Sequence, residues 1–265
     1  MVIHWHKKME RGMAYVMLGR CENLKDIFIA GEFKKEGINV DNEALEESKA
    51  LEKAFQDDQQ LFPLSSFLKV SFLNVRSLRA HIEDVKLDNS IVGSDFFGLA
   101  ETWLYQNESL SIEGFQSCFV NVGKGKGIAS FSKIGLETVV SSSIGDNYSA
   151  ICVRSQYLDI IFVYLSQDFN KDQLFTLLDD WIVDTKETAL LGDVNWNYLE
   201  EEHDMKKFMI KKGFSQLIES PTHEKGSLID HVYVNEKLSE NGCLALQESV
   251  HFSDHNLITL LVNKE

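Results

Sequence analysis

The chain has no apolar run long enough to cross a membrane and no apolar stretch near its N-terminus of the kind that directs secretion. The longest apolar run lies around Ile160 to Leu165, whereas a spanning helix needs about 20 apolar residues. The first residues, MVIHWHKKMERG, carry charged side chains and lack the apolar centre of a signal peptide. The sequence therefore predicts no membrane partner.

Cysteines are few, and no two of them are closely spaced. The chain has four in 265 residues and no CxxC pair: Cys21, Cys118, Cys152 and Cys243. Cys118 and Cys152 stand in apolar segments, which is typical of small buried side chains. This usage suits a reduced compartment better than a disulfide scaffold, so an intracellular location is expected.

Positive charge is also scarce. Lys and Arg number 26 against 41 Asp and Glu, which gives a formal net charge of -15. Non-specific affinity for nucleic acid comes from cations that neutralise phosphates, so this balance argues against a protein that coats DNA. It does not exclude a nuclease, because a metal site needs carboxylates and a local basic rim can coexist with an acidic whole.

A phosphate-binding loop of the GxxxxGK[ST] type is absent as well. Gly123 to Gly127 (GKGKG) has the glycines of such a loop but not their spacing. No other motif of a nucleotide-driven motor occurs in the chain. The sequence therefore predicts that the protein neither binds nor hydrolyses ATP.

What the chain does have is enough apolar content for one sizeable core, with 44% hydrophobic residues. Short apolar runs alternate with polar helical stretches. Strands are predicted at 67–73, 96–100, 128–131, 150–153, 158–164, 189–191, 231–234 and 257–262, and helices at 81–89, 171–185 and 201–212. This mixed order predicts a layered α/β (α+β) domain in which two sheets pack face to face with helices outside.

Polar side chains that can bind metal or phosphate stand at the ends of these apolar runs. They are Asn74 in LNVRSL, Glu101 in LAETWL, Asp193 and Asn195 in LLGDVNWN, Asp230 in SLIDHVYV, and Ser253-Asp254-His255. Side chains at strand ends can converge at one rim of a sheet, and converging carboxylates hold a hard cation such as Mg²⁺. Cleavage of a phosphate ester is the leading hypothesis from this pattern.

These five motifs, in this order, resemble the endonuclease/exonuclease/phosphatase superfamily over about 67–262. The nearest likeness is to the abasic-endonuclease-like domains of retrotransposons and Helitron-type transposons. The resemblance implies a four-layer α/β sandwich of two mixed sheets, Mg²⁺ as cofactor with Mn²⁺ as an alternative, and DNA as substrate. For a DNA substrate the nucleus is one option for the location.

The resemblance also implies a role for each polar residue. Glu101 would be the main metal ligand, with Trp103 fixing its loop, and Asp254 would be the second acid at the metal. Asp193 would be the general base or would orient the attacking water. Asn195 would hold the phosphate or lock the Asp193 carboxylate. Val194 stands where the family more often has Phe, an apolar replacement.

Further residues complete the site that the resemblance implies. Protonated His255 would contact the phosphate, with Asp230 as its partner, and Asn74 would orient Glu101 or the phosphate. Tyr164 matches a family tyrosine that touches the scissile phosphate, although the family usually continues with Pro where this chain has Leu165. A core tyrosine is an equal alternative. Arg76, with Arg79, Lys124 and Lys126, would form a basic lip for the DNA backbone. His203, His223 and His251 show no spacing that indicates a role.

The first part of the chain, before the segment with the five motifs, resembles a different kind of protein. The segment RGMAYVMLGRCENLKDIFIAGEF resembles the C-terminal end of a superfamily-one DNA helicase, with Arg20 at the position of an ATP-contacting arginine. An acidic segment of helical pattern follows at 41–58. The predicted organisation is a helicase remnant with a helical linker at 1–62 and the endonuclease/exonuclease/phosphatase domain at 63–265, as in a Helitron-type element. A monomer is expected.

Two other functions stay open at this stage. The same superfamily includes phosphatases and phosphodiesterases that act on lipid or small-molecule phosphates, and a fold cannot choose among substrates. The chain is also compatible with an inactive transposon relic that keeps only the shape of the domain. Substrate panels separate the first alternative, and a metal-dependent shift in melting temperature separates the second.

Overall fold

A computed structural model describes residues 2–4, 28–30, 67–200 and 203–264, and the chain divides into two compact units, Met1–Leu64 and Ser65–Glu265. In the first unit, β1 (Val2–His4) pairs in parallel with β2 (Phe28–Ala30). The rest of the predicted helicase remnant, including Arg20, and the predicted helical linker lie outside the described residues. The interpretation of 1–62 therefore stays a prediction.

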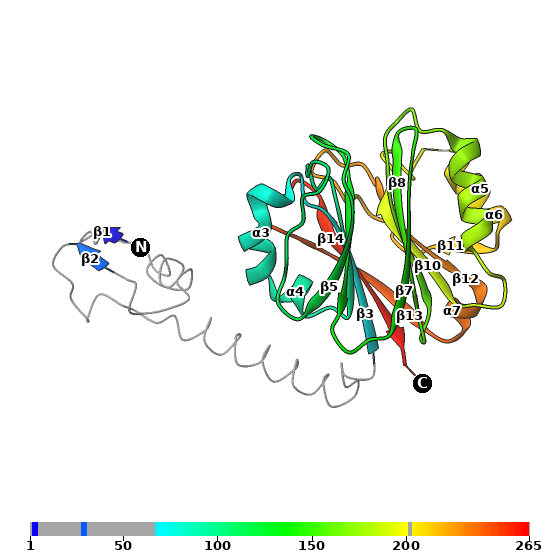
Figure 1. Ribbon diagram of the computed structural model, residues 1–265, viewed down its shortest axis with the longest axis horizontal. Helices are drawn as coiled ribbons and strands as arrows, with labels where there is room; N and C mark the ends of the chain where they lie inside the picture. Colours follow the sequence, from blue (N-terminus) through cyan, green and yellow to red (C-terminus); the bar gives the residue numbers. More distant parts are fainter. Residues whose placement is uncertain (1, 5–27, 31–66, 201–202, 265) are drawn as a thin grey trace. The chain divides into compact units, whose positions relative to one another are not determined.

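The second unit is built on two six-stranded sheets that pack face to face (Figure 1). The order in one sheet is β13 (Cys243–Ser249), β14 (Asn256–Asn263), β3 (Phe67–Asn74), β4 (Phe96–Ala100), β6 (Ile128–Lys133) and β5 (Phe115–Val120). The order in the other is β11 (Phe214–Gln216), β12 (Asp230–Asn235), β10 (Thr188–Asp193), β9 (Asp159–Leu165), β8 (Tyr148–Ser155) and β7 (Thr138–Gly145). Both sheets are mixed, because β3 and β4 run parallel, as do β9 and β10, while the other pairs are antiparallel.

Helices cover the outer faces of the two sheets (Figure 1). α3 (Leu78–Leu87) and α4 (Asn89–Val92) pack on the first sheet, and α5 (Lys171–Trp181) and α6 (Asp204–Lys211) pack on the second. Short α7 (Glu236–Glu240) follows β12. None of the helices in the described part of the chain is long and apolar enough to cross a membrane. The predicted four-layer sandwich is confirmed.

The inter-sheet core explains why the central strands are apolar on both faces. Every residue of β9 is buried, since one face meets the opposite sheet and the other meets α5 and α6. Between the sheets the rings of Phe72 and Phe162 stack at 6.4 Å. Gly98 permits this approach, because a Cβ there would lie 2.4 Å from the Phe162 ring. A side chain at that position would force the sheets apart where they carry the polar residues described below.

The four edge strands of the sheets, β5, β7, β11 and β13, were not among the predicted strands. Most of their side chains are partly buried or exposed, so they lack the apolar runs that identify a central strand. The predicted helix at 171–185 ends at Trp181, because Ile182 adopts extended backbone. The predicted helix at 81–89 begins earlier, at Leu78, and stops before Asp88, whose carboxylate caps α4.

Candidate active site

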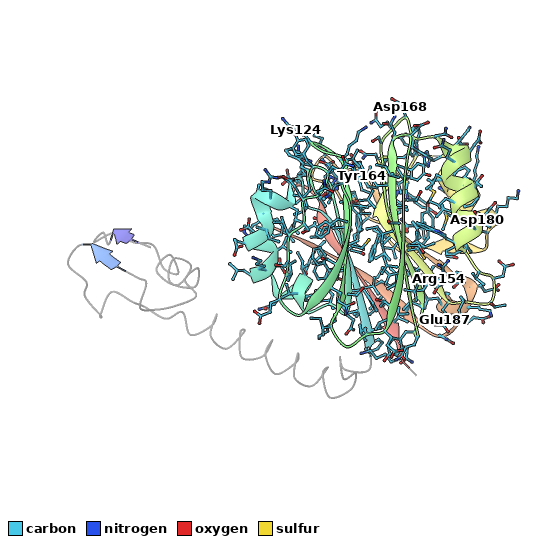
Figure 2. The ribbon with its side chains drawn as sticks, in the orientation of Figure 1. Lys124, Arg154, Tyr164, Asp168, Asp180 and Glu187 are labelled. Carbon is cyan, nitrogen blue, oxygen red and sulfur yellow. The ribbon has the colours of Figure 1, made fainter. Side chains whose placement is uncertain are left out.

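The polar residues predicted from the sequence meet at one end of the two sheets. β3 and β4 run parallel and deliver Asn74 and Glu101, while β9 and β10 run parallel and deliver Tyr164 and Asp193. Antiparallel β12 begins where β10 ends, so Asp230 pairs in register with Asp193. Tyr164 lies toward this end of the domain, whereas Arg154 and Glu187 lie toward the opposite end (Figure 2).

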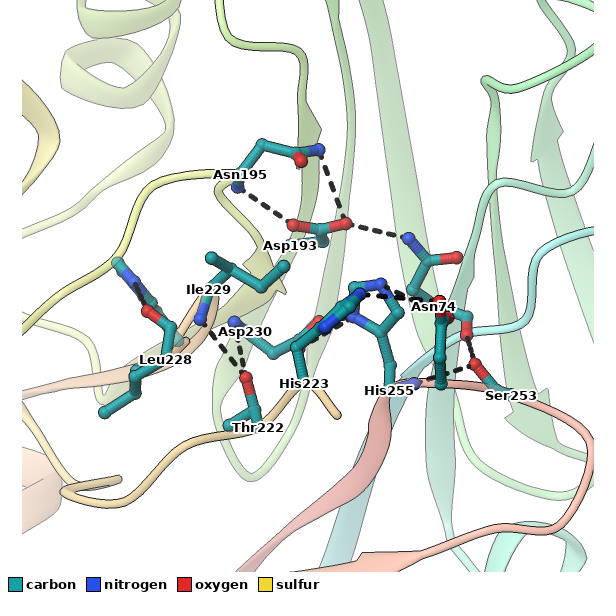
Figure 3. A network of polar contacts seen from close by, with 12 residues as sticks. Asn74, Asp193, Asn195, Thr222, His223, Leu228, Ile229, Asp230, Ser253 and His255 are labelled. Carbon is teal, nitrogen blue, oxygen red and sulfur yellow. Dashed lines mark hydrogen bonds and ion pairs between the residues drawn. The ribbon is translucent and has the colours of Figure 1, made fainter. Parts of the chain in front are cut away.

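Asn74 joins the two sheets. Its amide nitrogen donates one hydrogen bond to Glu101 Oε1 at 3.0 Å and another to Asp193 Oδ2 at 2.8 Å. A side-chain amide has two N–H donors, and both are used here on carboxylates from different sheets. Asn74 is held in turn by the Arg76 backbone N–H, which donates to its Oδ1. The Ser253 hydroxyl donates to the Asn74 backbone carbonyl (Figure 3).

This geometry gives the first testable prediction. Asn74→Ala removes both donors and leaves two neighbouring carboxylates without their shared partner. We expect the melting temperature to fall by an amount equivalent to about 1–3 kcal/mol, the cost of unsatisfied buried groups. Calorimetry measures this effect. Asn121→Ala is the matched control, because that amide also donates twice, but to backbone carbonyls in a surface loop. Equal losses for the two variants would contradict a special role of Asn74 between the sheets.

Glu101 is held in a fixed orientation. Its second oxygen accepts a hydrogen bond from the Trp103 indole N–H at 3.1 Å, so the predicted contact of Trp103 is confirmed. Glu101 and Trp103 have left-handed backbone, with φ of 49° and 55°. Of the seven described non-glycine residues in this region of φ, five surround the site: Arg76, Ser77, Glu101, Trp103 and Asn195. Such conformations cost energy and persist where surrounding structure imposes them, which is a recurrent property of functional sites.

Asp193 is the centre of the arrangement and is only 1% exposed. The backbone N–H of Asn195 donates to its Oδ1 at 2.9 Å, and the Asn195 amide nitrogen donates to the Leu165 carbonyl at 2.9 Å. Of the two predicted roles for Asn195, locking the carboxylate fits these contacts. Burial, and next the negative charge of Asp230, raise the pKa of Asp193 well above its ordinary value, against the opposing charge of His255. A carboxylate with a raised pKa is a better proton acceptor near neutral pH.

Asp230 and His255 form a buried pair. The Nδ1 atom of His255 lies 3.1 Å and 2.9 Å from the two Asp230 oxygens. Burial alone would lower the pKa of His255, but the charge and hydrogen bond of Asp230 outweigh it and raise the pKa to about 9. His255 is therefore a cation at neutral pH, and its Nε2 lies 3.9 Å from Asp254 Oδ1. His231 lies on the other face of β12, where it contacts the Tyr233 hydroxyl.

Asp254 and Arg76 contact each other directly, with 2.5 Å between the guanidinium and Asp254 Oδ2. Arg79 is likewise paired with Glu108. Both arginines of the predicted basic lip therefore have carboxylate partners, and their charge is balanced within the protein. The remaining members of that lip, Lys124 and Lys126, lie in the loop before β6.

His223 is part of the site, although its spacing in the chain did not indicate a role. Its backbone bridges that of His255, the two rings meet edge to face at 4.7 Å, and its Nε2 lies 3.4 Å from Asp254 Oδ2. Its Nδ1 accepts the Lys225 backbone N–H at 3.0 Å, so the proton of the neutral ring is on Nε2. The Nε2 side of His223 thus faces Asp254. The one sequence signal for His223 is that it lies seven residues before Asp230 in the chain.

Tyr164 stands beside the carboxylates at the end of β9. Burial, followed by the charges of Glu101 and Asp193, raises the pKa of its phenol far above the ordinary value, so the hydroxyl keeps its proton. That hydroxyl donates to the Gly125 carbonyl at 3.0 Å. Tyr164 is only 6% exposed, so the structure supports its proximity to the site and also its place in the core.

Glu101 and Asp254 each have an oxygen to offer a divalent cation, although Glu101 belongs to neither group of clustered ligand atoms. Each Glu101 oxygen accepts a single hydrogen bond, and a carboxylate oxygen can accept two, so both retain a free lone pair. Asp254 Oδ1 is buried and has no hydrogen-bond partner among the described residues. Oxygen donors of this kind suit Mg²⁺ or Mn²⁺. Two groups of three side chains have ligand atoms within 4.8 Å of one another: His223, Asp254 and His255, and Asp193, Asp230 and His255. In the second group, Asp230 and His255 already satisfy each other.

Solved structures with a similar architecture include three nucleases. The endonuclease domain of TRAS1, a telomere-specific non-LTR retrotransposon, superposes with a TM-score of 0.56 at 14% identity over 75% of this chain and 99% of that chain. The 3'-5' exonuclease NExo of Neisseria meningitidis has a TM-score of 0.58 at 17% identity, over 74% and 99%. An AP endonuclease of Archaeoglobus fulgidus has a TM-score of 0.58 at 18% identity, over 74% and 99%.

At the level of sequence, no protein-family model and no curated protein matches the chain. The structural likeness, at these identities, establishes the fold, which is that of endonuclease/exonuclease/phosphatase proteins. A fold of this kind is compatible with several hydrolases, so the activity must be argued from the residues of the site itself.

Proposed function

We propose that the protein is a Mg²⁺-dependent phosphodiester hydrolase that nicks DNA. The observation that carries this proposal is the single polar network that links Glu101 through Asn74 to Asp193 and places the Asp230–His255 pair beside it. Figure 3 shows the part of this network formed by Asn74, Asp193, Asp230 and His255. The network draws on both sheets, and its members come from distant parts of the chain. Phosphate-ester hydrolysis needs carboxylates that hold a metal ion, a group that accepts a proton, and a positively charged side chain that faces the phosphate. This set of residues supplies all three.

Each residue has a task in this proposal. Glu101 and Asp254 hold the cation, which when bound neutralises phosphate charge and stabilises the leaving oxygen. Asp193 orients the attacking water and accepts its proton, since it is fixed by Asn74 and Asn195. Protonated His255 donates from Nε2 to a phosphate oxygen as negative charge develops there, and Asp230 keeps the ring charged and oriented.

Conversion of supercoiled plasmid to the open circle tests the proposal. We expect nicking in millimolar Mg²⁺ or Mn²⁺, and none in EDTA, because the carboxylates alone cannot neutralise the phosphate. Readdition of the metal to the EDTA sample should restore the activity, which controls for irreversible damage. Metal-independent nicking at the same rate would contradict the assignment of Glu101 and Asp254 to a cation.

A phosphatase is the second candidate, because a structure of NExo with the same fold is described as a 3' phosphatase bound to product DNA. A panel of plasmid, abasic duplex, 3'-phosphorylated duplex and inositol phosphate separates the candidates. An inactive relic is the third. A folded protein whose melting temperature does not change over millimolar Mg²⁺ or Mn²⁺ would favour that reading.

The origin of the chain belongs to the same proposal. The resemblance of 11–33 to a helicase end, followed by a domain of the TRAS1 endonuclease fold, supports derivation from a transposable element. DNA would then be the natural substrate, and an intracellular location, with the nucleus as one option, follows from it.

A further inference from the structure

A small pocket adjoins Tyr164 and plays no part in the chemistry proposed above. Its volume is about 30 Å³, enough for a water molecule or one ligand oxygen. Lys126 and Asn147 line it together with Ser149, Tyr164 and Ser166. Val122, Gly145 and Tyr148 complete the lining, so the pocket is narrow, with apolar walls and a few polar groups, of which Lys126 is the cation.

Lys126 has a neutral hydrogen-bond partner, whereas the two arginines near the site have carboxylate partners. Its ammonium group donates to Asn147 Oδ1 at 2.9 Å, and this amide is neutral. Arg76 and Arg79, by contrast, are paired with carboxylates. Lys126 makes no ion pair among the described residues, so its positive charge is not balanced within the pocket.

Asn147 is placed to hold that lysine. It occupies the turn between β7 and β8 with a left-handed φ of 61°, which asparagine tolerates better than most residues. Its amide nitrogen donates to the Asp168 carbonyl at 3.3 Å, and its own carbonyl accepts the Ser166 backbone N–H at 2.8 Å. The turn is therefore tied to the segment that follows β9, and the side-chain oxygen is directed at Lys126.

The backbone of Lys126 is tied to the active-site loop. The Trp103 backbone N–H donates to the Lys126 carbonyl at 3.1 Å, and the Tyr164 hydroxyl donates to the neighbouring Gly125 carbonyl. Lys124 lies 5.8 Å from the centre of the Trp103 ring, on the same rim (Figure 2). The lysine is thus held at a fixed distance from the loop that carries Glu101.

We propose that Lys126 and Asn147 form a subsite for the phosphate that neighbours the reacting one in a polynucleotide strand. The chain carries a large negative charge, and Glu101, Asp193 and Asp254 concentrate part of it at the site. A bound polynucleotide is itself negatively charged, so each of its phosphates needs a positive group nearby. The proposed metal ion neutralises the reacting phosphate, and Lys126 neutralises the neighbouring phosphate. The inference rests on the proposed function and narrows its substrate to nucleic acid strands over compounds with a single phosphate.

Binding of DNA tests the subsite without requiring cleavage. The probe is a short fluorescein-labelled DNA duplex in Ca²⁺, followed by anisotropy over a range of salt concentrations. Lys126→Met, which keeps the aliphatic stem, is expected to weaken binding about tenfold and to reduce the slope of log affinity against log salt by about one. Lys133→Met at the opposite end of β6 is the control and should change neither quantity.

Asn147→Asp provides a second variant that keeps the lysine, although it loses the amide donor to the Asp168 carbonyl. The new carboxylate would pair with Lys126 and balance its charge, so binding should weaken to a similar extent. Hydrolysis of bis(4-nitrophenyl) phosphate, which has one phosphate, should stay within about twofold of the parent for both variants, as expected for a contact that contributes to strand binding alone.

The outcomes distinguish this inference from the proposed function. Unchanged DNA affinity and salt slope in both variants would overturn the subsite. Equal losses on DNA and on bis(4-nitrophenyl) phosphate would also overturn it, because Lys126 would then serve the reaction itself or the fold. A parent protein that binds DNA through Lys126 but never nicks it would leave the subsite supported and the proposed nuclease refuted.

Discussion

Asp193→Asn is expected to lower the rate of plasmid nicking by about 10²- to 10⁴-fold, the range typical for loss of a general base. The substitution keeps the size of the side chain but removes its negative charge and one acceptor oxygen. The new amide would also bring an N–H donor against a donor of Asn74 or of Asn195, which now both point at the carboxylate. Both the proton acceptor and its fixed orientation are therefore lost.

A matched control exists on the adjacent strand of the same sheet. Asp159 begins β9 at the opposite end from Tyr164, is 2% exposed, and pairs with Arg154 at 3.5 Å. Asp159→Asn also replaces a buried strand-end carboxylate, but far from the candidate site. We expect it to lower the melting temperature with little effect on nicking per folded molecule. Nicking that survives in Asp193→Asn, or falls equally in Asp159→Asn, would show that the site assignment is wrong.

Those parts of the site that stand at the ends of apolar strands could be predicted from the sequence. Parallel neighbours end at the same side of a sheet, so Asn74 with Glu101, and Tyr164 with Asp193, could be placed together from their positions after apolar runs. The contact of Trp103 with Glu101 was also predictable, because the two residues are only two positions apart in the chain. The two packed sheets with outer helices followed from the same pattern of buried central strands.

Other features depend on contacts that no local pattern encodes. His223 reaches Asp254 and His255 only because the segment after β11 folds back against the loop before β14. Arg76 was expected to face DNA, yet Asp254, 178 residues away in the chain, takes its guanidinium. The amide of Asn74 selects its two carboxylates through the distance between sheets, which the packing of Phe72, Gly98 and Phe162 sets. These are consequences of tertiary packing.

Asp230→Asn is expected to remove a stabilisation that depends on pH. The folded pKa of His255 is about 9, above the value of 6.5 for an unperturbed histidine. A raised pKa means that the pair stabilises the fold fully below about pH 6.5 and that this stability is lost as pH rises through about 9. Each pKa unit corresponds to about 1.4 kcal/mol, so the loss should be of order 3 kcal/mol in the parent.

Melting temperatures between pH 6 and pH 10 measure this effect. The parent should lose stability steadily across the upper part of that range, whereas Asp230→Asn should be less stable at pH 6 and show a much flatter profile. The Asp193→Asn variant should keep most of the alkaline loss, because Asp230 contributes more than Asp193 to the raised pKa of His255. A parent profile that is flat from pH 6 to pH 10 would contradict a protonated, Asp230-paired His255.

A second Asp–His pair in the same domain serves as the control. Asp84 and His81 lie 3.0 Å apart on α3, but both side chains are partly exposed. Exposed pairs contribute about 0–1 kcal/mol, because water screens the charges, so Asp84→Asn should leave the profile almost unchanged. The same comparison applies to nicking: with Asp230→Asn the imidazole loses its proton at a lower pH, and the alkaline limit of activity should move down, while with Asp84→Asn it should stay. The buried pair then acts on stability and on chemistry through one shared cause, the carboxylate that keeps His255 charged.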